Sequence, residues 1–201
     1  MDVINWDAEP DLERLERLNK TLDQSPAEAV PELEELVAQG SAVGALYLGS
    51  YYLAERKDKL SDEAKAAFWY EKAHVRGIGQ ASYMLGRLRY RKKDFNGAFE
   101  VFRVGADRLY LPAMYRTAKM YQDGEGVPAD FAECVRLLQL AEAEGHIFSR
   151  RDLAGLMVAG KLGPAAIPRG VAMLAKLTAD MAWMIKQIAK PGSIHSERVL
   201  A

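Results

Sequence analysis

The sequence feature that most constrains the fold is a helix-forming segment that occurs three times at a regular interval. The three segments are 62–77, 94–109 and 130–145, which align without gaps. Asp62, Asp94 and Asp130 coincide at their first position. An aspartate in front of an apolar periodic run is typical of a helix N-cap, because its carboxylate can accept a hydrogen bond from a free backbone N–H group. Each segment is therefore predicted to form one helix, which we name the B helix.

A second helical pattern, the A helix, precedes each B helix and also follows the last one. The A helices are expected at 41–54, 79–92, 111–124 and 147–160. Small residues recur in them at two positions that lie five residues apart: Gly44, Ala81, Ala113 and Ser149 at the first, and Gly49, Gly86, Ala118 and Ala154 at the second. Small side chains at these positions would let a neighbouring helix approach closely.

The residues that close each unit recur with a period typical of stacked helix pairs. These closing residues are Gly40, Gly77, Leu109 and Gly145, at spacings of 37, 32 and 36 residues. Self-similarity at such a period indicates a solenoid, in which no repeat can bury its apolar face alone.

The glycine-rich stretch GEGVPAD at 124–130 could instead be a phosphate-binding loop that leads into a helix. A phosphate-binding loop is disfavoured, because the stretch lies where the other pairs have their turn between the A and B helices. The equivalent turns, 54–62 and 90–94, contain no glycine. We therefore predict that 124–130 is the turn of the third pair.

The combined pattern resembles the Sel-like repeat (SLR) family, which is related to tetratricopeptide repeats. The matching residues are Leu48, Gly49 and Tyr52 in the A helix, Gly124, Gly126, Val127 and Asp130 in the turn, and Asp62, Ala66, Trp69, Tyr70, Ala73 and Gly77 in the B helix. The resemblance implies an all-α fold, a right-handed α/α superhelical solenoid of about four SLR-type helix pairs with N- and C-terminal capping helices. It also implies a protein-interaction scaffold that is usually not catalytic.

The predicted organisation is one solenoid domain. Its parts are N-terminal capping helices at 1–40, repeat 1 at 41–77, repeat 2 at 78–109, repeat 3 at 110–145, a degenerate repeat 4 with a long turn at 146–170, and a C-terminal helix and tail at 171–201. An apolar stripe on the helix at 171–190 is expected to pack on repeat 4, and Trp183 would then point away from it, towards the tail at 192–201, a second copy of the chain or solvent. The stripe comprises Leu174, Leu177, Met181, Met184, Ile185 and Ile188.

Composition argues against a metal site or a catalytic site. The 201 residues include a single cysteine, Cys134, and three scattered histidines, His74, His146 and His195, so we expect no disulfide, no metal and no cofactor. Cys134 is expected to be a small buried residue, as are the aromatic residues of the B helices. If Met1 is the true start, the acidic N-terminus is not a signal peptide, and with no apolar run of about 18 residues we expect a cytoplasmic protein without a membrane span.

A partner is expected to bind the A helices, which line the concave side of such solenoids. Residues 84–119 contain nine Lys or Arg against three Asp or Glu, whereas residues 1–63 contain six against fifteen. The middle of the groove would therefore attract an acidic protein segment, although a merely solvated helix face is an equal alternative, and nucleic acid is disfavoured by the acidic region beside it. The predicted partner-binding residues are Tyr47, Met84, Arg87, Arg91, Arg116 and Lys119.

The sequence thus predicts a non-catalytic protein–protein interaction scaffold or adaptor. Two alternatives stay open: an enzyme or enzyme subunit that uses the groove as a pocket, and a structural element that forms a homodimer through its C-terminal helix.

Overall fold

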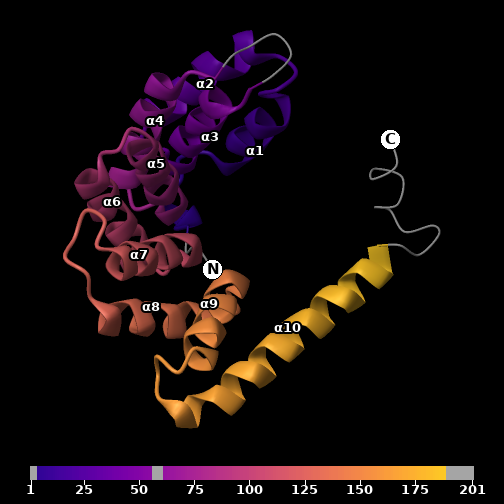
Figure 1. The fold of residues 1–201 in the computed structure, drawn as a ribbon. Coiled ribbons are helices and arrows are strands. Elements are labelled where there is room, and N and C mark those ends of the chain that lie inside the picture. Colours follow the sequence, from indigo (N-terminus) through magenta and orange to yellow (C-terminus); the bar gives the residue numbers. More distant parts are fainter. Residues whose placement is uncertain (1–3, 56–60, 189–201) are drawn as a thin grey trace. The chain divides into compact units, whose positions relative to one another are not determined.

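The computed structural model describes residues 4–55 and 61–188, and over these residues the chain is all-α, as predicted. Short 3-10 helices lie at η1 (Trp6–Ala8) and η2 (Pro164–Ala166). The α-helices are α1 (Leu12–Thr21), α2 (Pro26–Ala38), α3 (Ala42–Leu53), α4 (Glu63–Val75), α5 (Gly79–Arg91), α6 (Phe95–Asp107), α7 (Leu111–Asp123), α8 (Phe131–Ala143), α9 (Ile147–Val158) and α10 (Ile167–Ile188) (Figure 1).

The helices form two compact units, residues 1–137 and 138–201, so the division falls inside α8. In the first unit, successive helices from α1 to α7 pack against one another, and the A helix α5 also contacts the next A helix, α7. This is the packing expected of stacked helix pairs. The second unit contains α9 packed against α10.

The three predicted aspartate caps are confirmed. The Oδ1 atom of Asp62 accepts a hydrogen bond from the backbone N–H of Lys65 at 2.9 Å. The same contact joins Asp94 to the third residue after it at 3.0 Å, and Asp130 to the third residue after it at 2.9 Å. Each carboxylate satisfies one of the backbone donors that a helix start leaves without an intrahelical acceptor.

The predicted closing residues end their helices with a left-handed backbone. Gly77 has φ of +101°, and Leu109, at the equivalent position of the next repeat, has φ of +60°. A leucine in this conformation is strained, because its Cβ approaches the following carbonyl group. Leu109 therefore keeps the closing geometry of the glycines without their conformational freedom.

The small residues of the A helices allow the close approach that the repeat pattern predicts. A Cβ atom on Gly49 would lie 2.6 Å from Cδ1 of Tyr70, and one on Gly86 would lie 2.6 Å from Cδ1 of Phe102. The side chains of Tyr70 and Phe102 are fully buried, as is Cys134, so the expected core roles of these residues are confirmed. In the first two pairs, one aromatic ring of the B helix thus fills the space beside a glycine of its A helix.

The stretch 124–130 is the turn between α7 and α8, and it packs on the start of α6. Gly126 has φ of +71°, and a Cβ atom there would lie 2.3 Å from the carbonyl oxygen of Phe95. The Tyr90 hydroxyl donates to the Glu125 carboxylate at 2.5 Å, which ties the turn to α5. Its glycines therefore have a packing reason that needs no phosphate.

The second unit differs from the expectation in two respects. Helix α10 begins at Ile167 rather than at 171, because Pro168 fits the first turn of a helix. The prediction that Met181 packs on the fourth repeat is wrong, since its side chain is 53% exposed. With 12 residues, α9 is about 18 Å long, against about 33 Å for the 22 residues of α10, so α9 can cover only part of the stripe.

Half-buried Leu174 and Leu177 lie in the covered part of α10. Trp183 is 65% exposed among the residues that the structure describes. The tail at 192–201, expected as one possible cover for Trp183, lies outside the described residues.

Candidate partner-binding face

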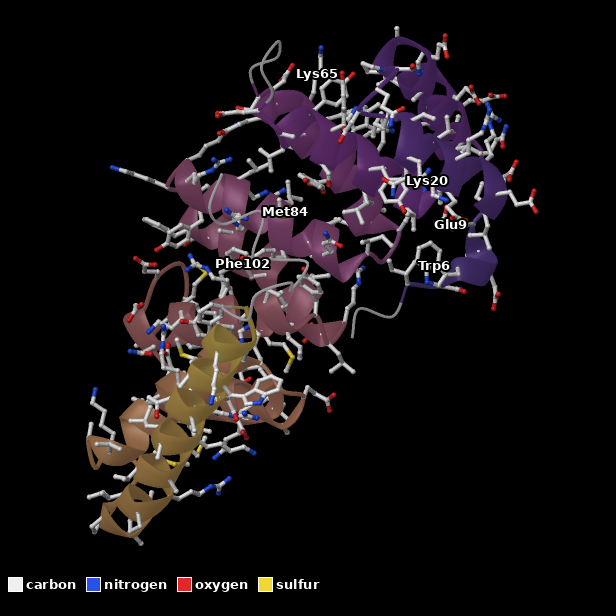
Figure 2. All side chains as sticks on the ribbon, turned by 90° about the vertical axis from the view of Figure 1, so that its right-hand side faces the viewer. Trp6, Glu9, Lys20, Lys65, Met84 and Phe102 are labelled. Atoms are coloured by element: carbon white, nitrogen blue, oxygen red, sulfur yellow. The ribbon has the colours of Figure 1, made fainter. Side chains whose placement is uncertain are left out.

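The structure brings three of the six predicted residues together on one cavity. Met84, Arg87 and Arg91 on α5 line a cavity of about 310 Å³. Figure 2 labels Met84 on α5 and Phe102 on the following helix, α6. The remaining wall is formed by Leu53, Glu55, Ser61 and Leu88. The polar members of that wall, Glu55 and Ser61, belong to the α3–α4 turn and lie outside the A helices to which the predicted residues belong.

Arg87 is an exposed cation beside this cavity. Its guanidinium carbon lies 5.7 Å from the ring centroid of Tyr83, and Nη1 lies 3.9 Å from Sδ of Met84. Among the described residues, no carboxylate is within ion-pair distance of Arg87. A cation held over a ring and a thioether keeps its hydrogen-bond donors available for an acidic ligand.

Arg91, on the same cavity, already has a partner. Its Nη2 lies 3.0 Å from a Glu63 carboxylate oxygen, and the side chains of Arg91 and Glu63 are 52% and 37% exposed. Such a surface ion pair contributes only about 0–1 kcal/mol, so an incoming carboxylate could replace Glu63 at little cost.

Arg116 on α7 is held within the helix stack. Its guanidinium carbon lies 4.7 Å from the Tyr90 ring and 5.7 Å from the Phe102 ring. Its Nε atom is buried and has no hydrogen-bond partner in the described part of the chain. The nearby carboxylate of Glu125 accepts the Tyr90 hydroxyl and thereby raises the pKa of Tyr90. Arg116 therefore packs against rings to a greater extent than the sequence suggests.

The last two predicted residues do not line the same cavity. Lys119 is half-buried and donates to Oε1 of Gln122 at 2.9 Å. Tyr47 is half-buried against the core of the first pairs, and burial raises its pKa, with a further contribution from the carboxylates of Glu9 and Glu16. The candidate face is thus centred on Met84, Arg87 and Arg91.

The two histidines that the structure describes, His74 and His146, make structural hydrogen bonds. Nδ1 of His74 lies 2.9 Å from Oγ of Ser82, and Arg108 donates to the His74 carbonyl oxygen at 2.8 Å. The Ser82 hydroxyl thus joins α5 to α4. Because Ser82 is fully buried, this hydroxyl is inaccessible to a substrate. His146 accepts from the backbone N–H of Ser149 at 3.3 Å and caps α9.

The described residues contain neither a candidate metal site nor a candidate membrane-spanning helix. No group of three or more His, Cys, Asp or Glu side chains there could hold a metal ion. No helix in the described ranges is both long enough and apolar enough to cross a membrane.

Comparison with curated proteins gives distant relatives. The Saccharomyces cerevisiae (strain ATCC 204508 / S288c) protein named Protein SHC1 is 25% identical over 155 residues, which cover 73% of this chain and 26% of the relative. The Arabidopsis thaliana ERAD-associated E3 ubiquitin-protein ligase component HRD3B is 29% identical over 98 residues, which cover 49% of this chain and 16% of the relative. The chain therefore spans about a quarter or less of the length of these relatives.

Two solved structures with a similar fold are matched over a larger share of their length than the curated relatives are. A protective antigen present in uropathogenic Escherichia coli strains, described as displaying an SLR fold, superposes with a TM-score of 0.67 at 19% identity, over 89% of this chain and 48% of the antigen. A Sel1 repeat protein from Oxalobacter formigenes gives a TM-score of 0.62 at 21% identity, over 79% and 68% of the two chains. These similarities show the fold.

The model of the Sel1 repeat family matches residues 42–73 and 111–146. The first match covers α3 and most of α4, and the second covers α7 and α8. Helices α5 and α6 form the same kind of pair between the two matches. The predicted resemblance is thereby confirmed: residues 42–73 and 111–146 match the Sel1 repeat, the SLR type of tetratricopeptide-related helix pair.

Proposed function

We propose that the chain is a non-catalytic adaptor that holds an acidic segment of a partner protein on its A helices. Sel1 repeats are generally protein–protein interaction modules. One relative, HRD3B, is by its name a component of a ubiquitin-protein ligase. A role in holding another protein is therefore the function that the repeats support best.

The observation that carries the proposal is Arg87, an exposed cation beside a cavity, with no carboxylate of the described residues in ion-pair range. Met84 supplies an adaptable apolar surface next to it, since a thioether can adjust to irregular partners. The surplus of basic residues over 84–119 extends the attraction along the chain. Charges of this kind act mainly on association rate and specificity.

The test begins with the partner itself, recovered by affinity purification from the native cell and identified by mass spectrometry. Arg87→Glu combined with Lys119→Glu should weaken binding of that partner and slow association, and raised salt should slow association of the parent chain in the same direction. Arg116 is left unchanged, because a glutamate between the Tyr90 and Phe102 rings would perturb folding as well as binding.

A matched control reverses the same number of charges elsewhere. Lys161→Glu combined with Lys176→Glu changes two exposed lysines of the second unit and should leave binding unchanged. Circular dichroism should show equal helicity in all three chains. If the Arg87/Lys119 variant binds as tightly as the parent, recognition does not occur on this face.

Self-association through α10 is a second candidate, favoured by the exposure of Met181 and Trp183. Large apolar side chains grouped on one helix are often covered by another surface. Light scattering over a dilution series separates the two cases. The average molar mass of a dissociating homodimer would fall on dilution, whereas that of a monomeric adaptor would stay constant.

A further inference from the structure

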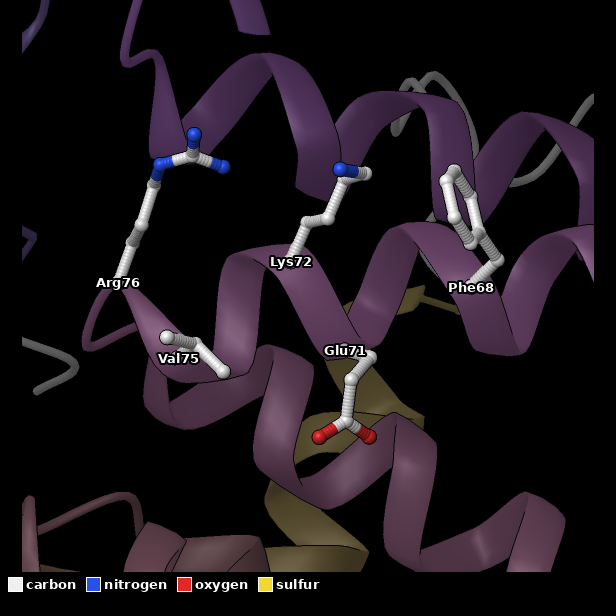
Figure 3. A pocket seen from close by; sticks show the side chains of 5 residues that line it. All are labelled: Phe68, Glu71, Lys72, Val75 and Arg76. Carbon is white, nitrogen blue, oxygen red and sulfur yellow. The ribbon is translucent and has the colours of Figure 1, made fainter.

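One exposed face of the B helix α4 has a composition that the packing of the repeats does not require. Phe68, Glu71, Lys72, Val75 and Arg76 line a cavity of about 390 Å³ (Figure 3). The side chain of Phe68 is 54% exposed and that of Val75 is 72% exposed. We name Phe68, Lys72, Val75 and Arg76 the α4 face.

The other B helices provide an internal comparison. Phe68 aligns with Glu100 on α6 and Arg136 on α8, and Val75 aligns with Asp107 and Ala143. On α6 the two acids are close to Arg103, at 2.9 Å from Glu100 and 3.7 Å from Asp107. On the equivalent surface of α6 both acidic side chains therefore have a basic partner on the same helix, whereas α4 presents two apolar side chains to solvent.

The two charged groups of the α4 face are both basic. Nζ of Lys72 lies 4.8 Å from the ring centroid of Phe68, and Nη2 of Arg76 donates to the carbonyl oxygen of Val37 at 3.2 Å. Neither cation has a carboxylate within ion-pair distance in the described ranges. The carboxylate of Glu71 is bound to Arg89 at 3.2 Å, and Figure 3 shows it pointing away from Lys72 and Arg76.

We propose that the α4 face is a second docking surface, which binds an acidic amphipathic segment of a partner protein. Phe68 and Val75 lie seven residues apart on α4, and this places their backbone positions about 10 Å apart along the helix axis. A helical segment with two apolar side chains at the same spacing can contact both of them. Carboxylates flanking those side chains would pair with Lys72 and Arg76, which supplies the charge complementarity.

This inference adds a surface to the proposed function and does not use the Arg87 cavity. Its probe is a fluorescein-labelled synthetic helical peptide of about 18 residues, with two leucines seven positions apart and glutamates at the flanking positions. A control peptide has serines in place of the leucines. Fluorescence anisotropy measures the affinity of the full chain and its variants for both peptides.

The diagnostic variant is Phe68→Glu combined with Val75→Asp, which gives α4 the residues that α6 has at the same positions. It should weaken binding of the leucine peptide at least about tenfold, because both apolar contacts are lost. Lys72→Glu should also weaken binding and reduce its dependence on salt. The matched variant Glu100→Gln with Asp107→Asn, on α6, should bind like the parent, and circular dichroism should show unchanged helicity throughout.

Several outcomes would overturn the proposal. The first is that the parent chain binds the two peptides equally or binds neither of them. The second is that the Phe68/Val75 variant binds the leucine peptide as tightly as the parent does. If the Arg87/Lys119 variant no longer binds the peptide and the Phe68/Val75 variant still does, the peptide binds the candidate face around Arg87. The α4 proposal then fails, and the proposed function stands. Loss of binding to anionic lipid vesicles but not to the peptide in the Phe68/Val75 variant would assign the α4 face to a membrane surface instead.

Discussion

Gly86 determines how closely α5 can approach α6, and this contact gives the sharpest prediction at the scale of single residues. Gly86→Leu must displace the Phe102 ring, because even a Cβ atom would lie 2.6 Å from two of its carbons. Phe102 is fully buried, so its ring cannot move without displacing its neighbours. We expect the variant to lose about 1–3 kcal/mol of unfolding free energy, measured by chemical denaturation followed by circular dichroism.

Gly155 is the matched control for that substitution. It is a helical glycine of α9, and nothing lies within 4 Å of the Cβ atom it would gain. Gly155→Ala should therefore leave stability unchanged or raise it by up to about 1 kcal/mol, since alanine favours a helix more than glycine does. An equal loss in the two variants would contradict the Phe102 contact as the reason for a glycine at 86, because helix propensity favours both substitutions.

At the scale of helices, the cap of α3 shows why the sequence predicts some elements better than others. The Glu9 carboxylate accepts from the backbone N–H groups of Ala42 at 3.0 Å and Val43 at 2.9 Å, and also from the Ser41 hydroxyl. The aspartate caps of the B helices could be predicted because cap and helix are adjacent in the chain. Glu9 could not, since it lies more than thirty residues before the helix that it caps.

The cap leads to a stability prediction for the first unit. Glu9→Ala should lower its unfolding free energy by about 1–2 kcal/mol, because two backbone donors and the Ser41 hydroxyl lose a charged acceptor. Glu13→Ala removes an exposed carboxylate from α1 and should have a much smaller effect. Thermal unfolding followed by circular dichroism compares the two, and similar melting temperatures for both variants would show that the Glu9 contacts contribute little.

The candidate site, like the helix caps, was predictable only where it depends on residues close together in the chain. Helical spacing correctly places Met84, Arg87 and Arg91 on one side of α5, because this depends only on the geometry of one helix. The stacking of Arg116 on rings from α5 and α6, and the exposure of Met181, depend on contacts between helices and on the short length of α9. No local pattern encodes such contacts. The α4 face is different, because the sequence does carry a signal for it: Phe68 aligns with charged residues in the other B helices.

At the scale of the whole molecule, two histidines link stability to pH, one in each unit. Burial lowers the pKa of His74, against the opposing influence of Glu71 and with smaller lowering contributions from Arg108 and Arg89. Burial alone lowers the pKa of His146. Nδ1 of His146 must be unprotonated to accept the backbone N–H of Ser149, so a proton on that nitrogen removes the cap of α9.

A lowered pKa in the folded chain means that the unfolded chain binds protons more readily. The stabilisation from both histidines is therefore complete above the unfolded pKa of about 6.5 and is lost as the pH falls through the folded values. His74→Asn with His146→Asn removes both titrating groups, and asparagine still serves as a helix cap at 146. Denaturation at pH 7.5 and at pH 5.5 should show a smaller acid-induced loss of unfolding free energy in the double variant than in the parent. An equal loss in both chains would show that His74 and His146 do not cause the acid sensitivity over this range, because carboxylates such as Glu133, whose pKa is lowered by its hydrogen bond to Arg136, lose their stabilising effect only at lower pH.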